Sequence, residues 1–149
     1  MRAVIQRVSR ASVAVDGAIV GEIQKGYLAL VCVEDGDEQV DAQYMIDKIS
    51  GLRIFEDAEG KMNLSIQDVQ GAALIVSQFT LMGDARKGRR PSFSRAARPD
   101  VAVPLLDRVI DGLKMLDIPV QTGQFQADMQ VSLINDGPVT ILLDSKKGF

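Results

Sequence analysis

Alternating apolar and polar positions predict β-strands near both ends of the chain. The segment RASVAVDGAIVGEI alternates on both sides of Asp16-Gly17, a pair that is typical of a tight hairpin turn. Near the C-terminus, residues 129–133 alternate in the same way, Asn135-Asp136-Gly137 predicts a turn, and residues 139–143 return as a strand. Both ends of the chain are therefore expected to form strand pairs closed by turns.

Longer apolar runs predict two further strands. Tyr27–Val33 is expected to be a strand buried on both faces and entered through Gly26, and Ala72–Leu81 is expected to be a second strongly apolar strand. A short strand is expected at Leu52–Phe55, followed by a turn in DAEG, residues 57–60. The second apolar run leads directly into a basic loop.

Apolar residues spaced three and four apart predict two helices. The first is expected at Asp37–Ser50, with acidic residues at its start and Gly51 just past its end. The second is expected after the basic loop, with Pro104 in its first turn. The apolar positions are Val40, Tyr44, Met45 and Ile49 in the first helix, and Leu105, Leu106, Val109, Ile110, Leu113 and Leu116 in the second.

This order of elements predicts a single α+β domain over residues 1–149, since no linker, repeat or low-complexity tract interrupts it. The sheet is expected to be barrel-like and mostly antiparallel, with the two main helices packed outside. A chain of 149 residues, 46% hydrophobic and 25% charged, has the size and composition of one ordinary globular domain.

The absence of histidine restricts the chemistry most. Ser-His-Asp and Cys-His catalysis both need an imidazole, and this chain has none. With a single cysteine, it also cannot build a zinc or copper site from thiolates and imidazoles, although a carboxylate site for magnesium stays open. If the chain is an enzyme, it uses carboxylates, hydroxyls, backbone amides or a group on its substrate.

Features that report on compartment point to the cytoplasm. Cys32 has no partner in the chain and lies in the apolar run YLALVCV, which indicates a buried thiol in a reducing environment. The longest apolar run, Tyr27–Val33, is much shorter than the ~20 residues that cross a bilayer. The opening MRAVIQRVSR does not resemble a secretory signal. We therefore expect a cytoplasmic protein with no membrane segment.

Charge is distributed unevenly along a chain whose net charge is −3. The segment Arg86–Arg98 contains six basic residues and no acid, whereas Glu34–Glu59 contains nine acids. One interpretation is a local binding site for a phosphate-bearing partner. The other is a solvated loop whose arginines pair with the acidic segment. Charge alone does not separate these two.

Three motifs make the sequence similar to a known family. They are SQFT (Ser77–Thr80), KGRRPSF (Lys87–Phe93) and NDGPVT (Asn135–Thr140). Together with the opening MRAVIQRV and the segment LRIFEDAEGKMN, they make the chain resemble the D-aminoacyl-tRNA deacylases along essentially its whole length. One departure is Gln126, where the family usually has a small residue.

The resemblance implies hydrolysis of the ester that joins a D-amino acid, or mischarged glycine, to the terminal ribose of tRNA. It also implies a homodimer of barrel-like α+β subunits with active sites at the dimer interface, and no metal or other cofactor. The expected partners are thus D-aminoacyl-tRNA, mischarged glycyl-tRNA and a second copy of the chain.

The resemblance maps the catalytic segment onto Ser77, Gln78, Phe79 and Thr80. From the residues alone, these positions would simply alternate along a strand, with Phe79 in the core. A hydroxyl nucleophile would need a base that the composition lacks. Backbone amides of Phe79 and Thr80 that hold the developing oxyanion, with a water assisted by the substrate's 2′-hydroxyl, fit the composition better.

The resemblance also assigns a chirality gate to Gly137 and Pro138. Residue types alone explain this segment as a hairpin turn. In the family the Gly-Pro bond is cis and reaches into the partner's site, where rigid carbonyls exclude an L side chain but cannot reject glycine. The matching arginine, Arg7, helps to fix the gate, although by pattern it is an edge or outward-facing residue, and Met129 lies close to the gate.

The basic residues Arg86, Lys87, Arg89 and Arg90 follow directly after SQFT. Because the end of tRNA carries phosphates just beyond its terminal ester, this position favours phosphate contacts over a solvated loop. Two other functions stay open, a non-catalytic RNA-binding module and a hydrolase of small acyl esters. The low aromatic content, 5% with no Trp, disfavours a stacking RNA platform.

Overall fold

The computed structural model describes residues 1–149 as one curved sheet, a small hairpin and two helices. In chain order the elements are β1 (Arg2–Val15), β2 (Ala18–Ile23), β3 (Gly26–Cys32), α1 (Gln39–Gly51), β4 (Phe55–Glu56), β5 (Met62–Leu64), β6 (Ala72–Ser77), the 3₁₀ helix η1 (Phe79–Met82), α2 (Pro99–Met115), β7 (Val120–Thr122) and β8 (Gln130–Asp144).

The sheet has antiparallel flanks and a parallel centre. Its order is β2-β1-β3-β6-β7, and β8 pairs with β1. β1 is antiparallel to β2, β3 and β8, whereas β3, β6 and β7 run parallel. β2 comes so close to β7 that a Cβ atom on Gly21 would collide with the carbonyl oxygen of Thr122. The sheet is therefore a nearly closed barrel, and the predicted barrel-like α+β fold is confirmed.

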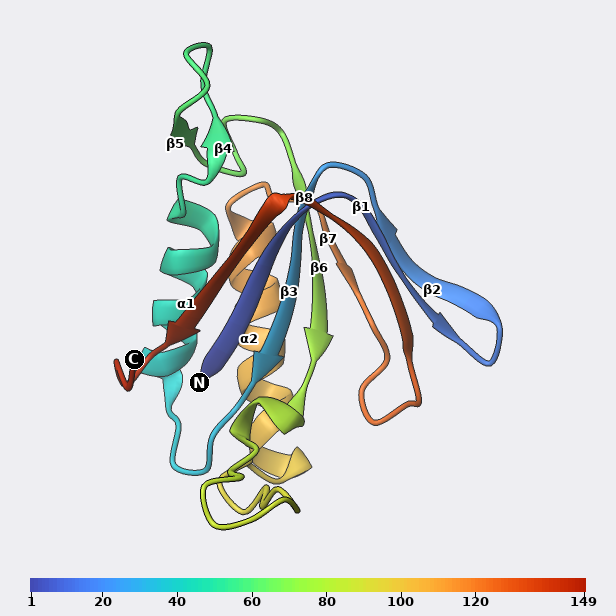
Figure 1. The fold of residues 1–149 in the computed structure, drawn as a ribbon, viewed down its shortest axis with the longest axis vertical. Coiled ribbons are helices and arrows are strands. Elements are labelled where there is room, and N and C mark those ends of the chain that lie inside the picture. The colour runs from blue at the N-terminus through green and yellow to red at the C-terminus, as the bar shows by residue number, and fades with distance from the viewer.

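The two faces of the sheet are buried in two different cores. In β3, Tyr27, Ala29 and Val31 point to the larger core under the helices, while Leu28 belongs to a smaller cluster on the other face. Figure 1 shows α1 and α2 side by side on one face of the sheet. The prediction that Tyr27–Val33 is buried on both faces is confirmed, because one face meets helices and the other the barrel interior.

Two predicted strands are shorter than expected. β6 ends at Ser77 and not at Leu81, because the chain turns into η1 after the amide of Gln78 donates to the carbonyl of Val31 (2.9 Å). β4 begins at Phe55 and not at Leu52. Leu52 caps α1, and the carbonyl of Ile54 accepts a hydrogen bond from Arg7, so neither extends a ladder.

Both predicted helices form, with corrected details. α1 spans Gln39–Gly51, and Val40, which the spacing places on its apolar face, is 71% exposed. α2 begins at Pro99, which occupies its first turn, whereas Pro104 lies inside the helix. The preference of proline for the first helical turn does not distinguish between two prolines that are five residues apart. The prediction from the sequence therefore assigned the wrong one to the first turn. No helix in the structure combines the length and apolar character that a membrane crossing requires.

The predicted turn near the C-terminus is wrong. β8 is one bent strand, and both of its halves pair with β1. Thr140 pairs with Gln6 and Asn135 pairs with Val8, which leaves residues 136–139 opposite Arg7 alone. NDGPVT is therefore a bulge in a continuous strand rather than the end of a hairpin.

Candidate active site

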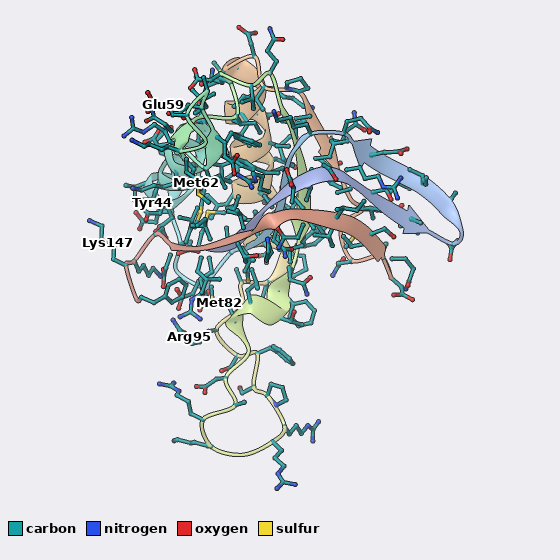
Figure 2. All side chains as sticks on the ribbon, turned by 45° about the horizontal axis from the view of Figure 1, so that its top comes forward. Tyr44, Glu59, Met62, Met82, Arg95 and Lys147 are labelled. Atoms are coloured by element: carbon teal, nitrogen blue, oxygen red, sulfur yellow. The ribbon has the colours of Figure 1, made fainter.

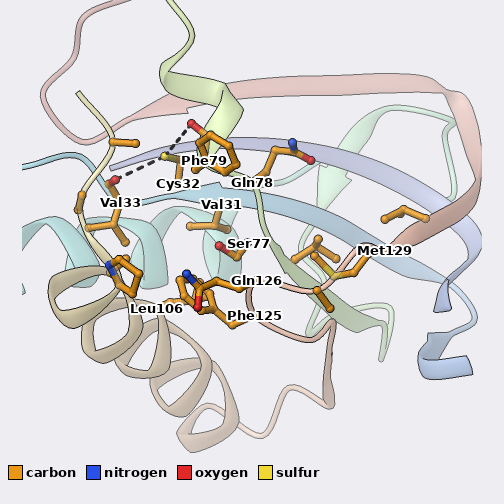
Figure 3. Close-up of a pocket in the computed structure, with 17 residues that line it drawn as sticks. Val31, Cys32, Val33, Ser77, Gln78, Phe79, Leu106, Phe125, Gln126 and Met129 are labelled. Carbon is orange, nitrogen blue, oxygen red and sulfur yellow. Dashed lines mark hydrogen bonds between the residues drawn. The ribbon is translucent and has the colours of Figure 1, made fainter. Parts of the chain in front are cut away.

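A cavity of about 530 Å³ opens at the carboxyl ends of the parallel strands β3 and β6 (Figure 3). The first turns of α2 and the loop between β7 and β8 form the rest of its wall. Of its 17 lining residues 13 are hydrophobic, and Ser77, Gln78 and Phe79 are among the 17. The catalytic segment predicted from the sequence thus lies at a preformed cavity, in the position where ligands bind to open parallel sheets.

The turn after β6 presents two backbone amides without acceptors. Phe79 and Thr80 are the first residues of η1, and neither amide N–H donates a hydrogen bond within the chain, whereas the neighbouring amides of Gln78 and Leu81 do. The first amides of a helix have no intrahelical acceptor. Phe79 lines the cavity and is 56% exposed rather than in the core, and Thr80 is exposed next to it, so the turn that carries these two amides lies at the edge of the cavity.

The hydroxyls of this segment have no base beside them. The side-chain amide nitrogen of Gln78 donates a hydrogen bond to Thr80 Oγ1. An N–H donor cannot accept the hydroxyl proton, so this contact orients Thr80 without activating it. Ser77 is half-buried and lines the cavity.

Cys32 lies in the same wall and is a poor nucleophile. Burial raises the pKa of its thiol to about 11, despite the opposing effect of the chain's N-terminal ammonium. The thiol lies within hydrogen-bonding distance of the carbonyl oxygens of Val33 (3.4 Å) and Phe79 (3.5 Å). Near neutral pH the thiol is therefore protonated and contacts the backbone of the turn after β6.

The bulge in β8 is held from within by Asn135. Its Oδ1 accepts a hydrogen bond from the amide of Val139 (2.9 Å), and its Nδ2 donates to Thr140 Oγ1 (3.0 Å). Gly137 has a φ of 140°, a conformation that L side chains rarely adopt, and the Gly137-Pro138 bond is cis, as the resemblance implies. Residue types alone place Asn135 in a turn, so they did not predict that its side chain would hold the bulge through these two hydrogen bonds.

Arg7 fixes the bulge from the neighbouring strand. Its Nε donates to the carbonyl oxygen of Asp136 (2.8 Å), and its Nη1 donates to that of Ile54 (2.7 Å). The residue is 6% exposed, so the interpretation of Arg7 as outward-facing is wrong. The guanidinium joins β8 to the segment between α1 and β4.

In one chain, the bulge and the cavity lie apart. Arg7, opposite the bulge, pairs with Tyr27 at the start of β3, whereas Ser77 pairs with Val31 near its end. Four positions along a strand correspond to ~13 Å. Neither Gly137 nor Pro138 lines the cavity. In Figure 1 the bend of β8 lies at the opposite end of the sheet from the turn that follows β6.

Met129 lies at the cavity and not at the bulge of its own chain. It lines the cavity and packs against the smaller core. Its sulfur sits so close to Gly123 that a Cβ at that position would meet Sδ at 2.6 Å. A side chain at position 123 would therefore require the flexible side chain of Met129 to shift.

The basic loop follows the turn after β6 and is closed by a short pair of backbone hydrogen bonds. Asp84 and Ser92 exchange two backbone hydrogen bonds, of 2.8 and 2.9 Å, which close the loop between them. Phe93 packs edge-on against Phe79, with ring centroids 5.3 Å apart. Figure 2 shows the loop extending away from the body of the structure, with Arg95 near its base.

The four basic residues of the loop are not equivalent. Arg86 forms a salt bridge with Asp84 (2.6 Å), and this hydrogen bonding lowers the pKa of Asp84. Lys87, Arg89 and Arg90 are exposed and form no salt bridge. Only one arginine of the Arg86–Arg98 segment, Arg95, pairs with the acidic segment, through Glu34. The interpretation in which the arginines of this segment pair with the acidic segment therefore holds for Arg95 alone.

Carboxylate and thiol side chains do not gather anywhere in the structure in a group of three or more that would suit a metal ion. The polar groups that line the cavity are instead those of Ser77, Gln78 and Gln126, together with backbone atoms.

These features define a class of protein: an α+β fold with a preformed cavity at the ends of two parallel strands. The model of the D-Tyr-tRNA(Tyr) deacylase family matches residues 4–144. The chain therefore belongs to the D-Tyr-tRNA(Tyr) deacylase family.

Individual relatives agree with this assignment. The chain is 57% identical to a D-aminoacyl-tRNA deacylase of Symbiobacterium thermophilum over 149 residues, which is 100% of this chain and 99% of the relative. It is 58% identical to the D-aminoacyl-tRNA deacylase of Anaeromyxobacter dehalogenans, with 100% of both chains covered.

Two solved structures share the fold. One, described as "c-Myc DNA Unwinding Element Binding Protein", superposes with a TM-score of 0.90 at 39% identity and covers 97% of this chain and 98% of its own. The other, described as a probable eukaryotic D-amino acid tRNA deacylase, has a TM-score of 0.78 at 19% identity, with 95% and 97% covered. The second likeness concerns the fold alone.

Proposed function

We propose that this chain hydrolyses the ester bond between a D-amino acid and the terminal adenosine of tRNA, through a site built from backbone groups. The coarse activity, D-aminoacyl-tRNA deacylation, follows from its family. The finer mechanism rests on one observation above all. The amides of Phe79 and Thr80 have no acceptor in the chain, and Phe79 lines the cavity.

In this mechanism the two amides bind the oxygen of the ester carbonyl. As water attacks the carbonyl carbon, negative charge develops on that oxygen and strengthens both hydrogen bonds. The 2′-hydroxyl of the terminal ribose positions or assists the water, and the ribose 3′-oxygen leaves with a proton. No side-chain nucleophile is needed, which agrees with the unactivated hydroxyls of Ser77 and Thr80 and the protonated thiol of Cys32.

Gly137 and Pro138 act as the chirality gate in the site of a second copy of the chain. Their distance from the cavity of their own chain supports this, because only a partner's cavity is then within reach. β8 also exposes Leu133, Ile134 and Leu142 (36%, 46% and 58%), which a second copy would cover. Rigid carbonyls at this gate exclude an L side chain but cannot exclude glycine, so glycyl-tRNA is a substrate as well.

The exposed cations Lys87, Arg89 and Arg90 contact phosphates of the tRNA end. Their loop is joined to the catalytic turn by the Phe79–Phe93 contact. A tRNA phosphate next to the bound ester is therefore expected to lie near these three cations.

Release of free D-tyrosine from D-tyrosyl-tRNA, with L-tyrosyl-tRNA left intact, tests this function against both alternatives. A non-catalytic RNA-binding module releases neither amino acid. A hydrolase of small acyl esters cleaves D-tyrosine methyl ester as readily as the RNA. Cleavage of D-aspartyl and glycyl esters on tRNA at comparable rates tests the gate, because backbone atoms cannot read a side chain.

Mixing two inactive variants tests the shared site. Phe79→Pro removes one amide donor, and Gly137→Ala forces a Cβ to within 2.7 Å of a methyl group of Val139. If each site combines the turn of one chain with the gate of the other, half of the randomly paired dimers regain one intact site, and about a quarter of the wild-type activity returns. Recovery of no activity contradicts a shared site.

A further inference from the structure

Gln126 stands at the cavity in a conformation that L side chains rarely adopt. Its φ is 62°, in the left-handed region that favours glycine. The loop around it is held in place, because Phe125 packs against the larger core and the amide of Gly123 donates to the carbonyl of Ile75 (3.1 Å). The position of Gln126 is therefore fixed by the fold, and strained backbone of this kind is often found at binding sites.

Gln126 is exposed at the open side of the cavity that it lines, and its side-chain amide forms no hydrogen bond within the chain. Figure 3 shows it beside Phe125, among side chains that are mostly apolar. One amide group, with donors and an acceptor available, thus faces a cavity in which 13 of 17 lining residues are hydrophobic. Such a group fixes the orientation of a ligand that is otherwise bound by apolar contact.

The proposed function supplies the ligand, and this inference rests on it. When the ester lies at the amides of Phe79 and Thr80, either the amino-acid side chain or the terminal adenosine can fill the adjoining cavity. Only the adenosine is the same in every aminoacyl-tRNA. A preformed cavity with an aromatic ring, Phe125, and a thioether, Met129, in its wall also suits the flat face of a purine.

We propose that the Gln126 amide binds the edge of the terminal adenine. Its Oε1 accepts from the 6-amino group and its Nε2 donates to N7, the paired arrangement by which glutamine recognises adenine. Gln126 is then a specificity-determining residue that positions the nucleotide and takes no part in bond cleavage. Its loss should raise KM and leave kcat unchanged.

The test compares Gln126→Leu, which keeps the shape and removes the polar atoms, with Gln124→Leu, an exposed neighbour outside the cavity. Each is measured on D-tyrosyl-tRNA ending in adenosine and on the same tRNA ending in purine riboside, which lacks the 6-amino group. Gln126→Leu should raise KM about tenfold on the adenosine substrate. The KM of the wild type should rise by a similar factor when purine riboside replaces adenosine. On the purine riboside substrate, Gln126→Leu should raise KM much less than it does on the adenosine substrate. Gln124→Leu should match the wild type throughout.

An unchanged KM for Gln126→Leu, or an equal loss on both substrates, overturns the inference and leaves the proposed function standing. An effect that follows the identity of the amino acid places the side chain in the cavity, and also overturns it. If the wild type releases no D-tyrosine at all, the proposed function fails and this inference with it. Gln126→Gly, which relieves the positive φ, serves as the second variant if Gln126→Leu does not fold.

Discussion

The guanidinium of Arg7 and the carbonyl of Asp136 are joined by a 2.8 Å hydrogen bond that ties β1 to the bulge in β8. The same side chain donates to Ile54 (2.7 Å). A planar fork can serve two carbonyls at once, and an ammonium group on a flexible stem cannot reproduce that geometry. Arg7 therefore holds the residue that immediately precedes the Gly137-Pro138 pair.

Arg7→Lys should lower both stability and chiral selectivity. A carbonyl left unpaired in this buried position costs about 1–3 kcal/mol, which urea unfolding measures directly. The ratio of D- to L-tyrosyl-tRNA cleavage should fall as the bulge loosens. Arg10→Lys, at an exposed position of the same strand, is the matched control. Wild-type stability and selectivity in Arg7→Lys would refute this role.

The oxyanion role of the Phe79 amide can be separated from the role of its ring. Phe79→Pro removes the N–H at the first position of η1, a position where proline is tolerated, and Phe79→Ala keeps the N–H but removes the ring. Phe79→Pro should lose about 10²- to 10³-fold more in kcat than Phe79→Ala, measured by single-turnover release of D-tyrosine. Equal losses would show that the ring matters and the amide does not.

The basic loop should set the salt dependence of tRNA binding. Reversal of Lys87 and Arg89 to Glu is expected to weaken binding and to flatten the slope of log K against log salt by about 0.7 for each phosphate that is no longer neutralised. The double variant Lys61→Glu and Lys114→Glu, at exposed positions outside the loop, changes the net charge equally and is the control. If the slope does not change, the loop is only a solvated surface.

Glu34 makes folding stability depend on pH. Burial raises the pKa of its carboxyl, but hydrogen bonding to Arg95 and the charge of Lys146 outweigh this and lower it below the ordinary 4.5. A carboxyl with a lowered pKa stabilises the fold above its ordinary pKa, and this contribution is lost as the pH falls through the folded-state pKa. Wild type should thus be more stable than Glu34→Gln near neutral pH, and urea titrations should show this difference shrinking as the pH falls below the ordinary carboxyl pKa. A gap that stays constant with pH would contradict this.

Local sequence patterns correctly predict the strands whose faces pack against a core. The alternation in β3 follows from its two buried faces, and the Asp16-Gly17 turn forms as expected, with positive φ at both residues. NDGPVT has the residue types of a turn, but β1 runs beside both halves of β8 and keeps the strand continuous. No local rule can detect that distant partner.

Side-chain roles in the site were harder to predict for the same reason. The acceptors of Arg7 lie 47 and 129 residues away in sequence, so its burial could not be read from its neighbours. Phe79 was expected in the core because the strand was expected to continue, and the turn at Gln78 exposes it instead. The motif Ser77–Thr80 predicts a site at this turn, whereas its free amides became visible only in the folded backbone.

The proposed mechanism uses no side-chain nucleophile, and single-turnover release of D-tyrosine distinguishes it from attack by a hydroxyl. Thr80 accepts a hydrogen bond from Gln78 and has no base to activate it, so Thr80→Ala should keep substantial activity. The second substrate carries hydrogen in place of the terminal 2′-hydroxyl and is esterified at the 3′-oxygen. Both enzymes should cleave it hardly at all. A folded but inactive Thr80→Ala, together with normal cleavage of the 2′-deoxy substrate by the wild type, would make Thr80 the nucleophile and contradict this mechanism.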